Sequence, residues 1–483
     1  MKLQNQLNKI FKVLKLYNSI VMGGGLVQLA AYGSQDVYLT TNPQITYFKT
    51  VYKRYTNFSM ESIYQLIEGN PTFGGNITIT VSRNGDLLGN VMLQLSLFDP
   101  STYINDSSGN GISCGWIQGI GNYLINNATL NIGGQQIDQQ YGKWMDIWSE
   151  LNLAGSQLAG YGAMVGKNYQ GPIYTPYNVN VEPNNQLQIP LQFWFCRNPG
   201  LAIPLIALQY HEVKIQLQFE KFVNLIVLTQ TSGGGVVTYL PVVQNNTPLP
   251  DFSKSLTIWN TYYYLDTTER RQFAQNAHEY LIEQVQTQNG NLTNLAGDNY
   301  IRLQLNHPTK DLIFVFNRNG SSAPMNDFSV GNDIAPCTIA STSSSTPPVI
   351  VIANTIGIPS QFAPLGTFKL LLNGTDRFKE RPGEYFRLTQ NYFHHTRCPS
   401  NYIYTYSFAL RPEEHQPSGT CNFSRIDTAQ LNFVLRNTSD PTGPLGFVPI
   451  KQDYSKPPMY TIYAPSYNIL RIMGGMAGLS YSN

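Results

Sequence analysis

The residues best suited to metal chemistry are His394, His395 and Cys398, which stand within five positions of one another. Imidazole and thiolate groups can ligate zinc, but a structural zinc site needs four ligands, and no second pair with suitable spacing occurs. The His-Glu pairs at 211–212 and 278–279 lack the second histidine of a His-Glu-x-x-His motif. We therefore expect no metal site. The cluster is interpreted as a polar surface loop, and the two pairs as hydrogen-bonded structural residues.

Other catalytic chemistry finds little support. The glycine runs at 23–25 and 233–235 lack the Lys-Ser/Thr pair that completes a phosphate-binding loop, so they are interpreted as flexible turns. We expect no catalytic residues, no cofactor-binding residues and no cofactor, and hence a protein that is not an enzyme.

The composition favours wide contacts with other protein subunits. Of the 483 residues, 42% are hydrophobic and only 12% charged, against roughly 25% charged in ordinary soluble proteins. A neutral polar surface has little desolvation cost on association. The net charge is +2, and no long basic block follows the first twenty residues, which disfavours direct binding of nucleic acid.

The cysteines and the hydropathy pattern favour a protein assembled in the cytosol. An odd number of widely spaced cysteines predicts reduced thiols, at Cys114, Cys196, Cys337, Cys398 and Cys421. No run approaches the roughly 18 apolar residues of a transmembrane helix, and we expect no signal peptide.

Residues 1–21 are predicted to form a basic amphipathic extension, because apolar residues recur at helical spacing with lysines mostly between them. The functional interpretation is an anchor on an anionic membrane or on a neighbouring subunit, carried by Lys2, Lys9, Phe11, Lys12 and Lys15. Two alternatives stay open: a frayed terminal helix, and a true start at Met22.

From there on, alternation of apolar and polar residues predicts β-strands. We expect strands at 187–195 and 213–219, each with one face in a core. Two further strands, at 76–82 and 87–98, flank an Arg-Asn-Gly-Asp sequence at 83–86. Its Asn-Gly pair predicts a tight hairpin between them.

Helical patterns are rare. Residues 141–151 carry apolar and aromatic side chains at helical spacing, which we interpret as core packing rather than a ligand cage. Asp266 with Glu269 resembles a capping box, which predicts a helix toward Gln275. Both helices are expected to be short and accessory.

Many short strands with long connections predict an all-β fold of sandwiches or barrels. Two internal echoes indicate two related halves: 130–134 resembles 371–374, and the strand-turn-strand pattern at 193–219 resembles 406–435. We expect a first domain at 22–240, a linker at 241–250 and a second domain at 251–483. Loops at 99–121, 154–185 and 317–365 are long enough to serve as towers or contact surfaces.

Many segments closely resemble the double jelly-roll major capsid proteins of nucleocytoplasmic large DNA viruses, especially those that infect algae and protists. They include GGLVQLAAYGSQDVYLT at 24–40, NPQITYFK at 42–49, PGLAIPLIALQYHEV at 199–213, QPSGTCNFSRID at 416–427 and YNILRIM at 467–473. The resemblance covers nearly the whole chain. It departs from the family at residues 1–21, because members usually begin near Met22.

The resemblance implies two tandem eight-stranded antiparallel jelly rolls with short accessory helices and long loops. It further implies a homotrimer that forms a pseudo-hexagonal capsomer, and many capsomers that tile an icosahedral virion shell over an internal membrane. The implied partners are neighbouring capsomers, minor capsid and penton proteins, and that membrane. Assembly is expected in the host cytoplasm.

Two further expectations concern carbohydrate. Algal-virus members of this family are glycoproteins, and among the Asn-x-Ser/Thr sequons Asn105 and Asn319 are best placed, in predicted outer loops. The alternative function is a jelly-roll protein that binds or cleaves carbohydrate, suggested by Tyr and Trp residues in loops. Acidic residues are sparse in the long loops, which counts against cleavage by a carboxylate pair.

Overall fold

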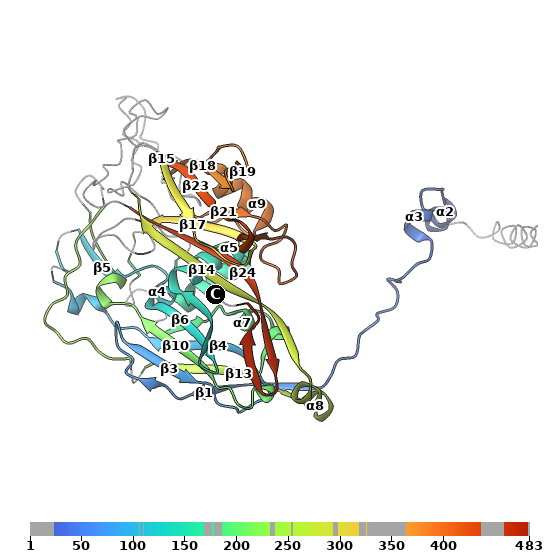
Figure 1. Ribbon diagram of the computed structural model, residues 1–483, viewed down its shortest axis with the longest axis horizontal. Helices are drawn as coiled ribbons and strands as arrows, with labels where there is room; N and C mark the ends of the chain where they lie inside the picture. Colours follow the sequence, from blue (N-terminus) through green and yellow to red (C-terminus); the bar gives the residue numbers. More distant parts are fainter. Residues whose placement is uncertain are drawn as a thin grey trace, which may run out of the picture. The chain divides into compact units, whose positions relative to one another are not determined.

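The computed structural model describes residues 24–105, 107–109, 111–168, 176–177, 186–231, 237–252, 255–292, 298–317, 325, 364–435 and 458–481. Two compact units divide at Thr56 and Asn57. The first contains helices α2 (Gly24–Ala30) and α3 (Val37–Thr40), and none of its described residues is buried. The second contains both predicted β-domains (Figure 1).

Eight strands form the first sandwich. In chain order they are β1 (Phe58–Gln65), β3 (Asn76–Thr80), β4 (Leu87–Ser96), β6 (Ile125–Ile132), β7 (Gln135–Tyr141), β8 (Gln186–Pro190), β10 (Val213–Phe219) and β13 (Thr257–Leu265). One sheet has the order β1-β13-β4-β8, and the other has β3-β10-β6-β7 with β2 (Glu68–Gly69) at its edge. Every printed pairing in these sheets is antiparallel.

The second sandwich repeats this arrangement. Its strands are β14 (His278–Asn291), β15 (Asp298–Leu303), β17 (Asp311–Asn317), β18 (Leu365–Leu372), β19 (Thr375–Asp376), β21 (Tyr404–Ser407), β23 (Ala429–Leu435) and β24 (Met459–Met473). The sheets are β21-β17-β24-β14 and β15-β23-β18-β19. In both sandwiches the first, eighth, third and sixth strands share one sheet, and the second, seventh, fourth and fifth share the other. This is jelly-roll connectivity, so the predicted fold is confirmed.

Shorter strands extend these sheets or form a small third one. They are β5 (Ile112–Trp116), β9 (Ile203–Pro204), β11 (Ile226–Thr231), β12 (Val237–Tyr239), β16 (Pro308–Thr309), β20 (Arg381–Pro382), β22 (Cys421–Asn422) and β25 (Met476–Leu479). The echo between 130–134 and 371–374 corresponds to equivalent hairpins, β6–β7 and β18–β19, which join the fourth and fifth strands. Gly133, Gly134, Asn373 and Gly374 all adopt the positive φ that these tight turns need.

Alternating burial explains why these segments pair as strands. β10 places Val213, Ile215, Leu217 and Phe219 in the core while the residues between them are exposed or half-buried, as predicted. In Figure 1 the first sandwich lies below the second, and the long strands β14 and β24 run between them.

The predicted hairpin at 76–98 is wrong. β3 and β4 lie in different sheets, and neither Asn84 nor Gly85 has the positive φ of a hairpin turn. The Arg-Asn-Gly-Asp segment is instead a corner between the sheets. A Cβ on Gly85 would lie 2.7 Å from the Cβ of Tyr262, so glycine permits close packing there. Asp86 then accepts a hydrogen bond from the Leu265 amide at 2.9 Å.

Two predicted boundaries also differ from the structure. The strand expected at 187–195 ends at Pro190, and Trp194–Arg197 forms helix α7. Trp194 and Phe195 are both buried, which consecutive residues of a one-sided strand cannot achieve. β13 lies beyond the linker expected at 241–250, yet it pairs with β1 and β4 as the eighth strand of the first sandwich.

Both predicted helices are present, as α5 (Gly142–Asn152) and α8 (Thr267–Gln275). The Asp266 side chain caps α8 by accepting hydrogen bonds from the amides of Thr268 and Glu269. Other helices are α4 (Ile120–Leu124), α6 (Leu158–Val165) and α9 (Gln390–His394), with the π-helical turn η7 (Tyr385–Thr389) just before α9.

Candidate assembly interface

Helix α5 connects the two sandwiches and is not accessory. It directly follows β7 of the first sandwich, but its apolar stripe belongs to the core cluster of the second, through Trp144, Ile147, Trp148 and Leu151. The Trp144 ring lies 5.4 Å from the Tyr463 ring on β24, measured between centroids. α5 thus covers the outward face of sheet β21-β17-β24-β14, and every residue of β17 is buried.

The second sandwich contributes to the first in return. Its strands β14, β24 and β25 place four apolar side chains in the core cluster of the first sandwich: Ile282, Leu470, Ile472 and Ala477. Because each sandwich completes the apolar core of the other, residues 57–483 form one compact unit rather than two separable domains.

A buried group of charges lies at this junction. The Lys310 side chain is fully buried, with Nζ 2.7 Å from Glu283 Oε1, and Arg197 donates to Glu283 Oε2 at 2.8 Å. The Arg197 guanidinium also lies 4.9 Å from the Trp148 ring centroid. Burial raises the pKa of Glu283, but the charges of Arg197 and Lys310 outweigh it and hold the pKa below its usual value.

A second charged group fixes the C-terminal end of α5. Lys167 lies between Asp146 and Glu150, at 2.7 and 2.8 Å. Arg397, from the second sandwich, pairs with the Glu150 carboxylate and donates to the Glu150 carbonyl at 2.9 Å. Since removing one partner of a buried ion pair leaves an uncompensated charge, these contacts make the orientation of the two sandwiches specific.

His395 lies between two carboxylates. Its Nε2 is 3.0 Å from Asp311 Oδ2, and its Nδ1 is 3.0 Å from Glu413 Oε1. Burial lowers the pKa of His395, but hydrogen bonds to Asp311 and Glu413 and the charges of these carboxylates raise it to about 9. The imidazole is therefore protonated at neutral pH, and it pins β17 to the loop that carries Glu413.

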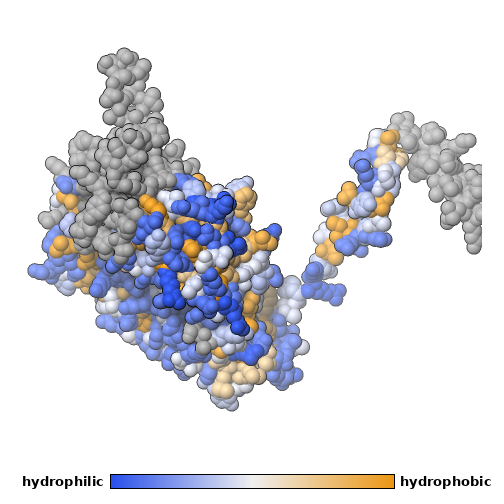
Figure 2. All heavy atoms as spheres, turned by 45° about the horizontal axis from the view of Figure 1, so that its top comes forward, coloured by the Kyte–Doolittle hydropathy of each residue, from blue (hydrophilic) through white to orange (hydrophobic). Residues whose placement is uncertain are grey.

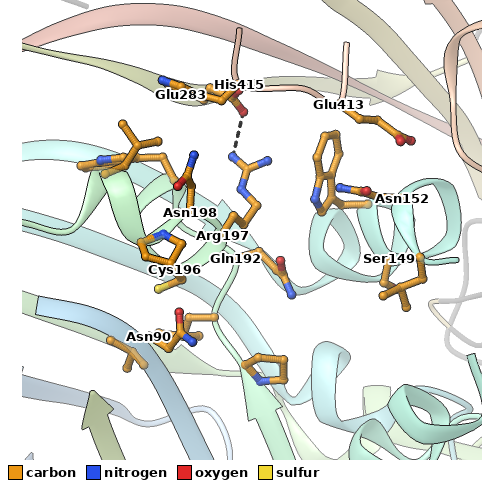
Figure 3. Close-up of a pocket in the computed structure, with 18 of the residues that line it drawn as sticks. Asn90, Ser149, Asn152, Gln192, Cys196, Arg197, Asn198, Glu283, Glu413 and His415 are labelled. Carbon is orange, nitrogen blue, oxygen red and sulfur yellow. Dashed lines mark hydrogen bonds and ion pairs between the residues drawn. The ribbon is translucent and has the colours of Figure 1, made fainter. Parts of the chain in front are cut away.

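A cavity of about 520 Å³ opens beside the first charged group (Figure 3). Its polar lining is rich in carboxamides, including those of Asn90, Asn152, Gln192 and Asn198. Arg197, which is ion-paired with Glu283, lies in the lining with His415 and Glu413, so the lining carries both signs of charge. Such a lining can hydrogen-bond a neutral polar group.

Large apolar side chains are exposed in both units. Segment 24–56 exposes thirteen of them, seven of which are aliphatic and six aromatic, among them Leu29, Tyr38, Tyr47 and Phe48. In Figure 2 this segment carries hydrophobic side chains, drawn in orange, on its surface. In the second unit, Leu388, Tyr392, Phe393 and Leu410 are exposed, and so are Met60, Tyr64 and Trp259. Clusters of this kind mark contact surfaces with other molecules.

Of the site residues predicted from the sequence, some lie in the part of the chain that the structure describes and others lie outside it. Asn105 is exposed in a turn after Ile104, as expected of a glycosylation acceptor, while Asn319 and the anchor residues Lys2, Lys9, Phe11, Lys12 and Lys15 lie outside the described residues. Within the part that is described, no helix is long and apolar enough to cross a membrane. The His-Glu pairs are hydrogen-bonded as predicted: His211 Nδ1 accepts from the Ala477 amide, and His278 Nε2 lies 2.7 Å from the Phe273 carbonyl oxygen.

The cluster at 394–398 is not simply a polar surface loop, because His395 is buried. His394 Nδ1 lies 3.1 Å from the Leu410 carbonyl oxygen, and the Cys398 thiol points to the Leu388 carbonyl oxygen. Over the described ranges, no group of three or more His, Cys, Asp or Glu side chains is arranged to hold a metal ion.

Sequence reasoning missed two features. The charged groups around α5 join residues that are up to 247 positions apart, so no local pattern could reveal them. Residues 111–115 match Gly-x-Ser-x-Gly, the pattern of a hydrolase nucleophile turn. Ser113, however, lies inside β5 and pairs with Thr229 of β11, so the strand-to-helix turn that this chemistry needs is absent at Ser113.

Comparisons with known proteins match this chain to viral major capsid proteins. Two family models match: one described as major capsid protein N-terminus, over residues 46–266, and one as large eukaryotic DNA virus major capsid protein, over 269–478. The chain is 39% identical to a major capsid protein of Phaeocystis pouchetii virus and 38% identical to one of Paramecium bursaria Chlorella virus 1. Each comparison covers 96% of this chain and 100% of the relative.

Solved structures give the same picture. A quasi-atomic model of the PBCV-1 virus capsid superposes with a TM-score of 0.69 at 35% identity, covering 91% of this chain and 100% of that chain. The Faustovirus major capsid protein superposes with a TM-score of 0.63 at 14% identity, covering 98% and 99%, which supports the fold alone.

Proposed function

The chain belongs to the family of large eukaryotic DNA virus major capsid proteins and is a structural protein of the virion capsid, and we propose that three copies associate into a pseudo-hexagonal capsomer. Many such capsomers tile the outer shell of an icosahedral virion, assembled in the host cytoplasm. The work of the protein is done by shape and contact rather than by catalysis.

The observation that supports this proposal is the repeated connectivity of the two sandwiches within one compact unit. Two similar sandwiches per chain and three chains per particle give six similar bodies around an axis. A trimer can then occupy a site of hexagonal symmetry with equivalent neighbours on all sides. The reciprocal burial between the sandwiches keeps their relative orientation constant, as a lattice requires.

Segment 24–56 is proposed to make contacts beyond the capsomer. Its exposed aromatic and aliphatic side chains cannot offset the conformational entropy of ordering unless another molecule covers them. Neighbouring capsomers and minor capsid or penton proteins are the partners we propose. Residues 1–21, with Lys2, Lys9, Lys12 and Lys15, are proposed to lie on the internal membrane. Asn105 is proposed as a glycosylation site.

Light scattering of the purified protein tests the capsomer. We expect a particle of three 54.1 kDa chains, stable on dilution. Removal of residues 1–56 should leave that trimer intact while it prevents growth into larger arrays. A full-length protein that stays monomeric at every concentration would contradict the proposal.

A further inference from the structure

The two sandwiches place a helical segment at the same point of their connectivity. In the first sandwich, α5 lies between the fifth and sixth strands, β7 and β8. In the second, η7 and α9 together form residues 385–394 between the fifth and sixth strands, β19 and β21. We call the latter the 385–394 helix.

The two helical segments differ in what covers them. In α5 the apolar stripe is buried, with Trp144 and Trp148 only 2% and 4% exposed. On the 385–394 helix, Tyr392 and Phe393 are 75% and 68% exposed. Leu388 lies one turn before Tyr392 on the same face, and it is exposed as well. No described residue covers this face.

The sheets that could receive such a helix differ in the complementary way. β17, the third strand of the second sandwich, is buried on both faces because α5 lies on its outward side. β4, the third strand of the first sandwich, is buried on its inward side only, and Asn90, Met92, Gln94 and Ser96 on its outward side are exposed or half-buried. The outward face of sheet β1-β13-β4-β8 is therefore open among the described residues on its β1 and β13 side, while Asn90, Met92 and Pro190 line the cavity of about 520 Å³ beside α5.

The same kind of receiving residue is present on both sheets. On the covered sheet, Tyr463 of the eighth strand pairs in register with Ile313 of the third, and its ring meets Trp144 of α5. On the open sheet, Trp259 of the eighth strand pairs with Met92 of the third and remains 37% exposed. Tyr64 supports it edge-on, with ring centroids 6.3 Å apart.

The outward face of the sheet and the exposed face of the 385–394 helix also match in charge, because both are neutral. The outward positions of the open sheet carry no charged side chain: Phe58, Met60, Ser62 and Tyr64 on β1, Thr257, Trp259, Thr261, Tyr263 and Leu265 on β13, the four outward residues of β4, and Gln186, Gln188 and Pro190 on β8. The exposed face of the 385–394 helix is likewise apolar and uncharged at Leu388, Tyr392 and Phe393. A charged partner would find no counter-charge on either surface, whereas a second copy of this chain supplies one neutral surface for the other.

We infer that the 385–394 helix of one chain docks on the outward face of sheet β1-β13-β4-β8 of a second copy, in the way that α5 docks within the chain. This inference rests on the proposed capsomer and specifies its subunit contact. Each of the six sandwiches then gives one helix to the next and receives one. α5 makes the three contacts within chains, and the 385–394 helix makes the three between chains.

Charge substitutions on both surfaces test the contact. Tyr392→Glu and Trp259→Arg should each raise the concentration of half-dissociation at least tenfold, measured by light scattering on a dilution series, because each buries an unpaired charge. Tyr300→Glu is the matched control. Tyr300 is 61% exposed but lies on the other sheet of the second sandwich, so the trimer should persist. The combination of Tyr392→Glu with Trp259→Arg should restore assembly.

A cross-linking measurement tests the same contact without charged substitutions and without measuring dissociation. In full-length protein with Tyr392→Cys and Thr261→Cys together, a bis-maleimide should produce covalent dimers and trimers. Both substitutions are made together with Cys398→Ser, because the exposed Cys398 thiol lies beside the Leu388 carbonyl and could itself react with a cysteine at position 261 of the other copy. In that background each single variant should give neither product.

The outcomes distinguish a failure of this contact from a failure of the proposed capsomer. A wild-type trimer whose Tyr392→Glu and Trp259→Arg variants dissociate no more readily than wild type overturns this contact and leaves the capsomer standing. Single variants that dissociate while their combination stays dissociated overturn the pairing of the two surfaces. A wild-type monomer removes the capsomer and the contact with it.

Discussion

Replacing His395 with glutamine should abolish most of the loss of stability that the protein shows between about pH 6.5 and 9. The folded pKa of about 9 exceeds the ordinary value of 6.5, so the folded state holds this proton more tightly than the unfolded chain. The resulting stabilisation is complete below pH 6.5 and is lost as the pH rises through 9. A difference of this size corresponds to about 3 kcal/mol.

The same interaction sets the cost of the substitution, which is largest at pH values where the wild-type imidazole is protonated. Asp311 is buried, and without the imidazolium its carboxylate loses the partner at 3.0 Å, a change that costs about 3 to 5 kcal/mol. At pH 6.5 the urea midpoint of His395→Gln should therefore lie well below that of wild type, and the two midpoints should converge toward pH 9.5.

The assay is urea unfolding followed by tryptophan fluorescence at several pH values, at one fixed subunit concentration because assembly also stabilises the folded state. His278→Gln is the control, because the imidazole of that half-buried histidine hydrogen-bonds the Phe273 carbonyl and stacks on the Phe273 ring, so the variant removes an imidazole without removing the partner of a buried carboxylate. A His395→Gln profile parallel to that of wild type from pH 6.5 to 9.5 would refute the reasoning.

Three further predictions concern the junction of the sandwiches. Burial raises the pKa of Asp138 to about 7, so wild-type stability should fall by about 4 kcal/mol as the pH rises from 4 to 7. Asp138→Asn should flatten that slope in urea unfolding, and an unchanged slope would count against the assignment. Trp148→Ala should lower the free energy of unfolding by about 3 to 5 kcal/mol, because it leaves a cavity under α5. The measurement is the thermal unfolding midpoint, and a midpoint equal to that of wild type within error would contradict this prediction. Gly142→Ala should reduce the yield of folded protein, because a Cβ there would overlap the carbonyl oxygens of two neighbouring residues. Gly155→Ala is the control and should not reduce the yield, because a Cβ there meets nothing within 4 Å. Equal yields of the two variants would contradict the steric explanation for Gly142.

Local chemistry was sufficient to predict the elements themselves. The alternation in 213–219 determines a one-sided strand, since successive side chains of a strand point to opposite faces. The stripe at 141–151 determines a helix with a buried face, and Asp266 determines where α8 begins. The echo of 130–134 in 371–374 indicated two related halves, and the structure shows equivalent hairpins there, because the same positive φ angles need the same small residues.

Contacts between distant residues decided the rest. The Asn-Gly pair at 84–85 is equally compatible with a hairpin and with a corner, and only the packing of Gly85 on Tyr262 selects the corner. The stripe of α5 specifies burial but not the partner, which proved to be the second sandwich. His394 and His395 are adjacent and chemically identical, yet one lies near the surface and the other between two carboxylates.

The sequence by itself therefore determined the strand at 213–219, helices α5 and α8 and, through its resemblance to capsid proteins, the fold. Only the tertiary structure decided which faces are covered within the chain and which are left for another copy. The physical reason is that periodicity reports how many faces of an element are apolar, whereas the identity of the covering surface depends on residues hundreds of positions away. The open face of sheet β1-β13-β4-β8 and the uncovered 385–394 helix become visible only when both sandwiches are seen together.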